Sequence, residues 1–136
     1  MTLNEEERAI IVQHRLERSK ETLDEAKDLL NSQHWHGATN RLYYACYYAV
    51  TALLIANECS SHTHGGAIGL FGKHFVSTGI FSSEQNKLYR KLFDLRQSGD
   101  YSDWIIIDEK DIQPLFEPAK QFIQAIENII SAKKLI

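Results

Sequence analysis

Two arginines are the residues of this chain whose type and surroundings best suit chemistry with an anion. Arg41 lies in NRLYYACYYAVTALLIAN, the most apolar run of the sequence, and Arg96 lies in LFDLRQSGDYSDW, among aspartates. A guanidinium is permanently charged, and its planar fork of N–H donors fits a phosphate or a carboxylate. Burying it without a partner is costly. Each arginine is therefore expected either to form an ion pair that fixes helix register or to line a groove that binds phosphate, and the sequence leaves both alternatives open.

Helical spacing and local charge identify the neighbours of the two arginines. One and two turns after Arg41, the same helix face carries Tyr44 and Tyr48. Arg96 lies near the expected end of a helix, where a cation is favoured, and several carboxylates are in reach. These carboxylates are Asp94, Asp100 and Asp103. The candidate binding residues are Arg41, Tyr44, Tyr48, Arg96, Asp100 and Tyr101.

Signals for other kinds of site are weaker. The six histidines include two pairs of the form His-x-His, His34 with His36 and His62 with His64, and imidazoles can ligate zinc. The chain has no Cys-x-x-Cys or His-Glu-x-x-His motif to support such a site, and no G-x-S-x-G motif for a serine nucleophile. We therefore expect neither a metal nor another cofactor.

Length and composition predict one globular domain over residues 1–136. The chain is 43% hydrophobic and 24% charged, and its net charge of -3 gives no overall attraction to nucleic acid. Its longest apolar stretch, residues 45–56, is shorter than the ~20 residues that span a bilayer, and the glutamate-rich start does not resemble a signal peptide. A cytoplasmic location without a membrane partner is expected. Cys46 and Cys59 lie roughly 20 Å apart along one predicted helix, so both are expected to be reduced.

Hydrophobic periodicity predicts an all-α, up-and-down bundle of four to five helices. A first long helix is expected to start at a capping box formed by Thr2 and Glu5 and to end near residues 31–33. The run 38–58 is apolar nearly all round, which indicates a central helix. Its alanines step by four and three along one narrow face that a neighbouring helix can approach closely. These alanines are Ala45, Ala49, Ala52 and Ala56.

Shorter elements complete the predicted bundle. Residues 59–66 are expected to form a loop, followed by a short amphipathic turn or helix that ends at Gly79. Ser82 and Gln85 have the capping-box spacing for the next helix, which Gly99 is expected to end. The last helix should begin near Pro114, with Pro118 in its first turn or at a kink, and WIIID (104–108) is the only strand-like fragment.

The residues around the two arginines resemble the HEPN domain family, specifically its small stand-alone prokaryotic branch. The pattern of that branch, R-x-Y-Y-A, then T-H-x-G and L-F-x-x-x-F-V-x-x-G, then L-R-x-x-x-D-Y, is present in this order at residues 41–45, 63–66, 70–79 and 95–101. The resemblance extends from the first predicted helix to Trp104. It implies a helical bundle that forms a homodimer and that is often encoded beside a minimal nucleotidyltransferase as a toxin and antitoxin pair.

The resemblance also implies a nucleotide- or RNA-binding role, with catalysis as the alternative. Active HEPN proteins are metal-independent endoribonucleases that use an R-x(4-6)-H motif, in which arginine steadies the scissile phosphate and histidine transfers protons. Here Tyr48 stands seven positions after Arg41 and Tyr101 five positions after Arg96. Neither tyrosine nor Asp100 titrates near neutral pH as histidine does.

His64 is the histidine that lies within the family pattern, and as a loop residue it would be able to move over an arginine cleft. The candidate catalytic residues are therefore Arg96, Asp100, Tyr101 and His64. The sequence favours a binding module, leaves a ribonuclease toxin as the alternative, and allows a third role as the substrate-binding subunit of a separate nucleotidyltransferase.

Overall fold

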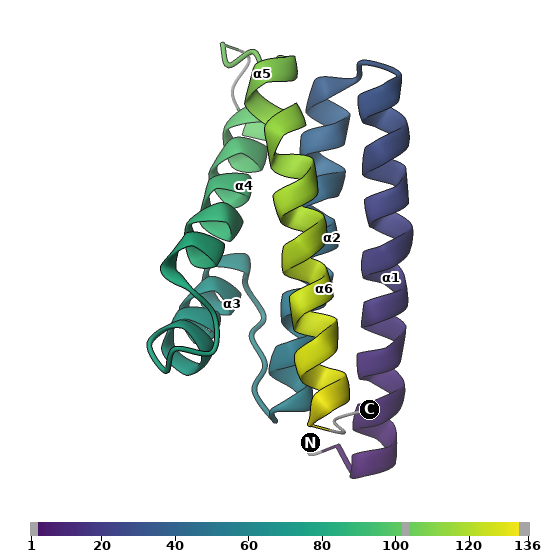
Figure 1. Ribbon diagram of the computed structural model, residues 1–136, viewed down its shortest axis with the longest axis vertical. Coiled ribbons are helices and arrows are strands. Elements are labelled where there is room, and N and C mark those ends of the chain that lie inside the picture. The colour runs from purple at the N-terminus through teal and green to yellow at the C-terminus, as the bar shows by residue number, and fades with distance from the viewer. Residues whose placement is uncertain (1–2, 102–103, 134–136) are drawn as a thin grey trace.

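The computed structural model of the chain describes residues 3–101 and 104–133, and the described residues form an all-helical bundle (Figure 1). The long helices α1, α2, α4 and α6 run alternately up and down, which confirms the predicted up-and-down architecture. The α-helices in chain order are α1 (Glu5–Asn31), α2 (Trp35–Ala56), α3 (His64–Phe71), α4 (Ser83–Tyr101), α5 (Glu109–Ile112) and α6 (Phe116–Ala132). A π-helical turn, η1 (Gly72–Val76), follows α3, and a 3-10 turn, η2 (Gln113–Leu115), precedes α6.

Helix α2 lies at the centre and contacts α1, α3, α4, α5 and α6. Its predicted alanine face is buried throughout, from Ala45 to Ala56. The small side chains bring α1 close enough for the buried Ser19 hydroxyl to donate a hydrogen bond of 2.6 Å to the carbonyl of Ala45. Because α2 is covered on most sides, a polar group on it must either find a partner or reach solvent at one of its margins.

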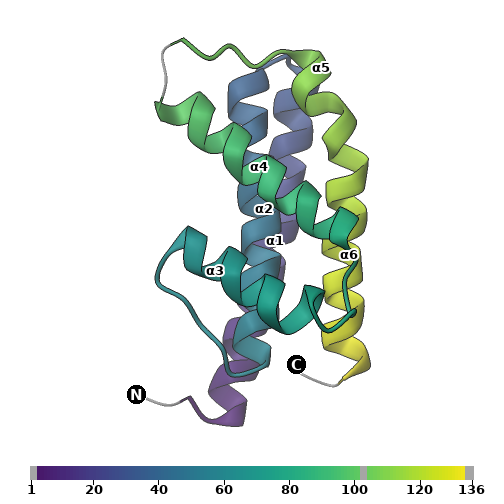
Figure 2. The ribbon, with the colours of Figure 1, turned by 90° about the vertical axis from the view of Figure 1, so that its left-hand side faces the viewer.

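Helices α3 and α4 cross one side of α2, as Figure 2 shows, and an aromatic cluster fixes them there. The ring of Phe71 on α3 packs edge-on against Tyr89 on α4 and Phe122 on α6, with centroids 5.8 and 5.6 Å apart. Tyr89 in turn stacks on Tyr43 of α2 at 6.3 Å. This packing determines where α4 presents Arg96 to α2.

Several predicted helix boundaries are confirmed and others are wrong. The Ser82–Gln85 capping box is present, and Pro118 lies in the first turn of α6. Helix α1 instead begins with a capping box between Asn4 and Glu7, because Asn4 adopts the extended cap conformation and accepts the Glu7 N–H. Thr2 lies outside the described residues. Residues 104–107 form no strand in the described part of the chain.

Gly99 was expected to end α4, but the helix continues to Tyr101. A side chain at this position would approach the Cδ1 atom of buried Ile107 to 2.8 Å. The glycine is therefore explained by the close passage of the segment that follows α4, not by a helix stop.

Cys46 is buried within α2, Cys59 is partly exposed, and neither forms a disulfide, as expected. None of the helices in residues 3–101 and 104–133 combines the length and the apolar character that crossing a bilayer requires.

Candidate functional site

Arg96 lies one turn before the end of α4, between two tyrosines of α2 and a carboxylate of its own helix. Its NH2 group donates a hydrogen bond of 3.0 Å to the Tyr44 hydroxyl, and its Nε lies 3.0 Å from Asp100 Oδ2. The guanidinium carbon lies 5.2 Å from the Tyr44 ring centroid and 5.7 Å from that of Tyr43. The side chain is 13% exposed. Arg96 is thus largely desolvated while it still reaches the surface, a setting that strengthens any charge interaction it makes.

Arg41 lies on α2 where this helix faces α1. Its Nε and NH2 groups donate to Asn40 Oδ1 at 3.1 and 2.8 Å, and its NH1 lies 3.8 Å from Glu25 of α1. The Glu25 side chain is 51% exposed, so this ion pair is a loose surface contact. The guanidinium carbon lies 5.2 Å from the Tyr44 ring centroid. Arg41 therefore meets a carboxylate of the facing helix and also remains near solvent.

The two arginines belong to one connected group of side chains. Asn40 Nδ2 donates a hydrogen bond of 3.2 Å to Asp100, which links the partner of Arg41 to the partner of Arg96. Because both guanidinium carbons lie 5.2 Å from the ring centroid of Tyr44, they are at most about 10 Å apart. We call Asn40, Arg41, Tyr44, Arg96 and Asp100 the arginine–tyrosine cluster. Asn40 was not among the sequence candidates, and only its position beside Arg41 signals it.

His64 lies in the first turn of α3 and not in a loop, which corrects the expectation from sequence. The Thr63 side chain caps this helix by accepting the Gly66 N–H at 2.9 Å, and the cap fixes the backbone of His64. The imidazole Nδ1 lies 2.6 Å from the hydroxyl oxygen of buried Tyr43. Its ring also packs 4.4 Å from the Tyr47 ring, centroid to centroid. His64 is therefore held in place beside the cluster and is not free to swing over it from a loop.

Burial and the charge of Arg96 determine the protonation states of His64 and Tyr43. Burial lowers the pKa of His64, and the positive charge of Arg96 lowers it further. Burial also raises the pKa of Tyr43 well above its usual range. At neutral pH the imidazole is neutral and the Tyr43 hydroxyl keeps its proton. The pair is thus suited to hydrogen bonding beside a fixed cation.

The remaining sequence candidates either contact other partners or lie outside the described residues. The Tyr48 ring lies 5.9 Å from that of Tyr44, but the cation over it is Arg18 of α1, at 5.2 Å. Tyr101 is the last residue of α4, and its side chain lies outside the described part of the structure. Asp103 lies outside the described residues. Among the described residues, Asp100 forms an ion pair with Arg96.

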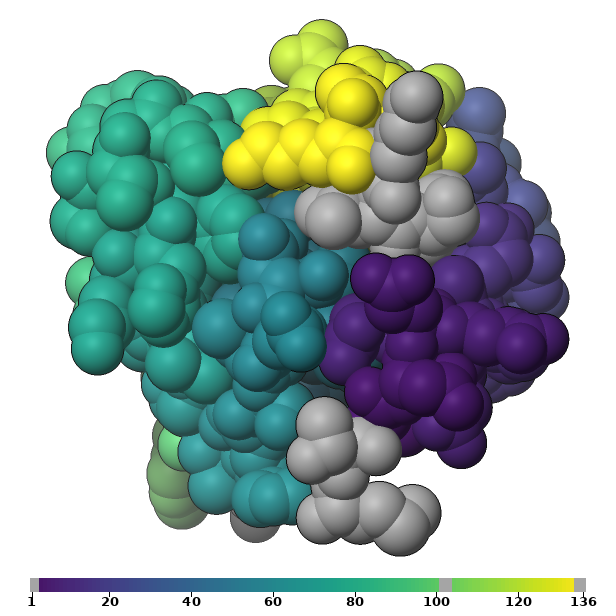
Figure 3. Space-filling view, turned by 90° about the horizontal axis from the view of Figure 1, so that it is seen from below, coloured from purple at the N-terminus to yellow at the C-terminus, as the bar shows by residue number. Residues whose placement is uncertain are grey.

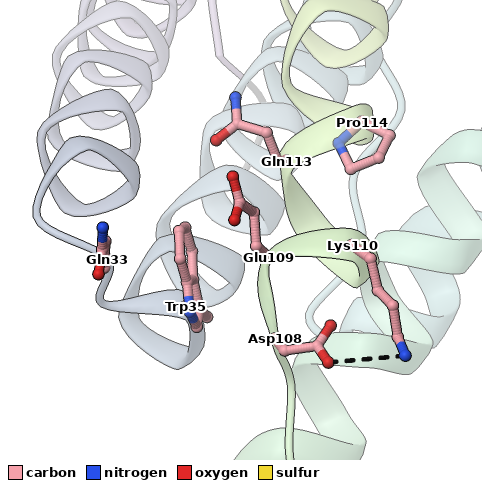
Figure 4. Close-up of a pocket in the computed structure, with 7 residues that line it drawn as sticks. All are labelled: Gln33, Trp35, Asp108, Glu109, Lys110, Gln113 and Pro114. Carbon is pink, nitrogen blue, oxygen red and sulfur yellow. Dashed lines mark ion pairs between the residues drawn. The ribbon is translucent and has the colours of Figure 1, made fainter.

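The histidine pairs do not converge. His36 Nε2 accepts the backbone N–H of Ile107 at 3.1 Å, a structural role, whereas His62 is exposed. Among the described residues no three His, Cys, Asp or Glu side chains gather in a way that would hold a metal ion. A separate surface hollow of about 680 Å³ lies at the α1–α2 turn and shares no residue with the cluster (Figure 4). Its lining residues are Gln33, Trp35, Asp108, Glu109, Lys110, Gln113 and Pro114.

Comparison with known proteins places these features in a family. Residues 12–129 match the model of the HEPN domain, a span that includes the whole cluster and His64. A Thermotoga maritima protein named UPF0332 protein is 37% identical over 132 residues, which cover 97% of this chain and 98% of that protein. A Methanocaldococcus jannaschii protein named "Putative toxin MJ0142" is 26% identical over 121 residues, 89% of this chain and 82% of that protein.

The fold also has a counterpart among solved structures. The crystal structure of TT1696 from Thermus thermophilus superposes with a TM-score of 0.73 over 86% of this chain and 96% of that chain. The sequence identity is 14%, so this likeness concerns the fold alone.

Proposed function

Because the chain belongs to the HEPN domain family, we propose that it is a nucleotide- or RNA-binding module whose arginine–tyrosine cluster holds a phosphate group. The observation that carries the proposal is the position of two guanidinium groups over one tyrosine ring. Charged forks beside an aromatic face suit the two parts of a nucleotide, its phosphate and its base.

The surroundings of the cluster support phosphate binding at a local site on an otherwise acidic protein. Arg96 is 13% exposed, so an anion that reaches it is partly shielded from water. Arg41 has a weak carboxylate partner that a stronger anion can displace. The neutral His64 beside them offers a further ring nitrogen for hydrogen bonding.

Binding of a short oligouridylate, measured by fluorescence anisotropy, tests the proposal. We expect Arg96→Gln and Arg41→Gln each to weaken binding about tenfold, because each removes a charge-assisted hydrogen bond to phosphate. Each should also reduce the slope of log affinity against log salt by about 0.7. Arg90→Gln, which removes an exposed arginine of the same helix α4, is the matched control and should change neither the slope nor the affinity beyond a small general effect.

Arg96→Lys separates binding from folding. This variant keeps the charge but loses the planar fork, so it should bind with intermediate affinity if Arg96 contacts phosphate. Folded Arg96 and Arg41 variants, judged by circular dichroism, that bind like the wild type would leave both arginines with a purely structural role.

We further propose that the chain forms a homodimer and acts as the HEPN half of a toxin and antitoxin pair, with a nucleotidyltransferase as its partner. Support comes from the relatives that carry the word toxin in their names. Co-expression with a nucleotidyltransferase encoded beside it, followed by purification through a tag on one chain only, should recover both proteins. Recovery of the tagged chain alone would contradict the pairing.

The alternative function is a metal-independent endoribonuclease, and the location of His64 next to Arg96 favours it specifically. In this reaction the 2′-oxygen of a ribose attacks phosphorus while the bond to the 5′-oxygen breaks. His64 would move the proton between these oxygens, and Arg96 would stabilise the charge that develops on phosphate. Digestion of single-stranded RNA in EDTA should then proceed with the wild type and fail with Arg96→Ala and with His64→Gln. Intact RNA in every lane would remove this alternative.

A further inference from the structure

An arginine-lined pocket opens beside the arginine–tyrosine cluster, between α1, α2 and the segment 57–63. Its volume is about 220 Å³, and two aliphatic residues of α2 form its apolar wall. Figure 3 views the bundle from this end, with the start of α1 beside the segment that follows α2. Arg8 of α1 and Glu58 of the segment form an ion pair of 3.3 Å. The polar lining consists of Arg15, Tyr47, Thr51, Ser60, Ser61 and His62.

Arg15 is the charged residue of this pocket. Within the described part of the chain it forms no ion pair, and its hydrogen bond is from NH1 to the Thr51 hydroxyl at 3.0 Å. The Thr51 hydroxyl accepts this bond and donates one to the carbonyl of Tyr48. It is a neutral partner and does not balance the charge of Arg15. Among the residues that the structure describes, no carboxylate lines the pocket, and the nearby Glu58 forms an ion pair with Arg8. The guanidinium therefore has charge and N–H donors available for an anion.

The pocket and the cluster lie next to each other along α2. Tyr47 lines the pocket, and its ring lies 6.0 Å from that of Tyr44 and 4.4 Å from that of His64. Thr51 and Tyr44 are seven residues apart on the helix, which corresponds to about 10 Å along its axis. One oligonucleotide strand can thus reach both sites, with a tyrosine between them on which a base can stack.

We propose that the Arg15 pocket binds a second phosphate of the RNA strand whose first phosphate lies at the arginine–tyrosine cluster. The inference rests on the proposed function, because the cluster defines where the strand begins its path. The Ser60 hydroxyl and the His62 imidazole, which also line the pocket, can donate further hydrogen bonds to the phosphate. The class of ligand is a single-stranded oligonucleotide with at least two phosphates.

Calorimetric titration with two unlabelled ligands tests this assignment. Hexauridylate carries several phosphates and reaches both sites, whereas the dinucleotide UpU carries a single one and occupies the cluster alone. Arg15→Gln should weaken hexauridylate binding about tenfold and leave UpU binding unchanged. Arg96→Gln should weaken both. Arg90→Gln again serves as the control for loss of an arginine charge.

A second variant changes the charge of the pocket and leaves Arg15 and its contacts unaltered. Ser60 is exposed, and its side chain forms no hydrogen bond within the described residues, so Ser60→Asp leaves the fold intact. It places a carboxylate beside Arg15, which should weaken hexauridylate binding as Arg15→Gln does. Wild-type affinity for hexauridylate in both folded variants would overturn the inference.

Failure of the proposed function has a different signature. If the wild type binds neither ligand, the cluster is not an RNA site. NMR titration with inorganic phosphate then tests separately whether the Arg15 pocket binds an anion. Shifts of the Arg15 Nε–H resonance that are lost in Ser60→Asp would support an anion pocket. An unchanged Arg15 resonance would reject it.

Discussion

The titratable imidazole of His64 contacts Tyr43 and lies within the electrostatic influence of the permanent charge of Arg96. Burial and this charge together lower the pKa of His64 below its usual 6.5. Replacing Arg96 by glutamine removes the repulsion of the protonated ring, so we expect the pKa of His64 to rise in Arg96→Gln. The titration of the His64 ring protons, followed by NMR in both proteins, measures the difference. Equal midpoints would mean that the guanidinium does not act on the imidazole.

The same pKa shift predicts the sign of a pH effect on stability. Since the pKa of His64 is lower in the folded chain than in the unfolded chain, its contribution to folding is fully present above the unfolded value near 6.5 and is lost as pH falls through the folded value. The free energy of unfolding should therefore decrease more steeply with acidification in the wild type than in His64→Gln. Urea denaturation at several pH values around and below neutrality gives both slopes, and parallel slopes would contradict the assignment.

At the level of single residues the sequence predicts which groups need partners, but not the partners themselves. Arg41 is identifiable because a charge in an apolar helix is costly to bury. Its partner Glu25 could not be selected without knowing how α1 packs on α2. Arg15 was missed entirely, because on α1 it looks like any other surface cation until the segment 57–63 folds over it.

At the scale of the elements, the stability of the short helix α3 depends on the cap at its first turn. The Thr63 hydroxyl accepts the Gly66 N–H at 2.9 Å, which satisfies one of the free donors at the helix start. Thr63→Ala removes this bond and should lower the free energy of unfolding by about 1 kcal/mol. Thr63→Ser keeps the hydroxyl and should retain most of the stability. Chemical denaturation of the three proteins checks this, and equal losses in both variants would show that the hydroxyl is not the cause.

The elements themselves were largely predictable, and the errors share a cause. Long periodic segments gave α1, α2 and α6 because burial of one face repeats along many turns. The errors fell at single residues whose role depends on distant chain. Gly99 looks like a helix stop, but it permits the approach of Ile107. His64 looks like a loop residue, but Thr63 starts a helix there.

On the scale of the whole molecule, the burial of Cys46 makes its thiol a reporter of global opening. It lies at the centre of α2, and burial raises its pKa far above the usual range, so little thiolate forms. In the native protein we expect prompt labelling of partly exposed Cys59 alone. The Cys59→Ser variant isolates Cys46, which should react only at the rate of unfolding. Prompt reaction of Cys46 in that variant, followed by mass spectrometry, would show that the bundle opens locally.

At the scale of the whole molecule, the fold class was predictable from the sequence, whereas the oligomeric state depends on surfaces that the sequence pattern does not define. An all-α bundle follows from periodicity and from the absence of strand patterns over most of the chain. The homodimer stays a prediction, and sedimentation of the protein at several concentrations would decide it.

Glu25 and Asp100 already neutralise Arg41 and Arg96 within the protein. Under the proposed function, an incoming anion would therefore replace one counter-ion by another instead of entering a vacant site, and its departure would let both acids return. Such an exchange costs affinity and speeds dissociation. A strand held in this way would therefore be bound briefly and released quickly.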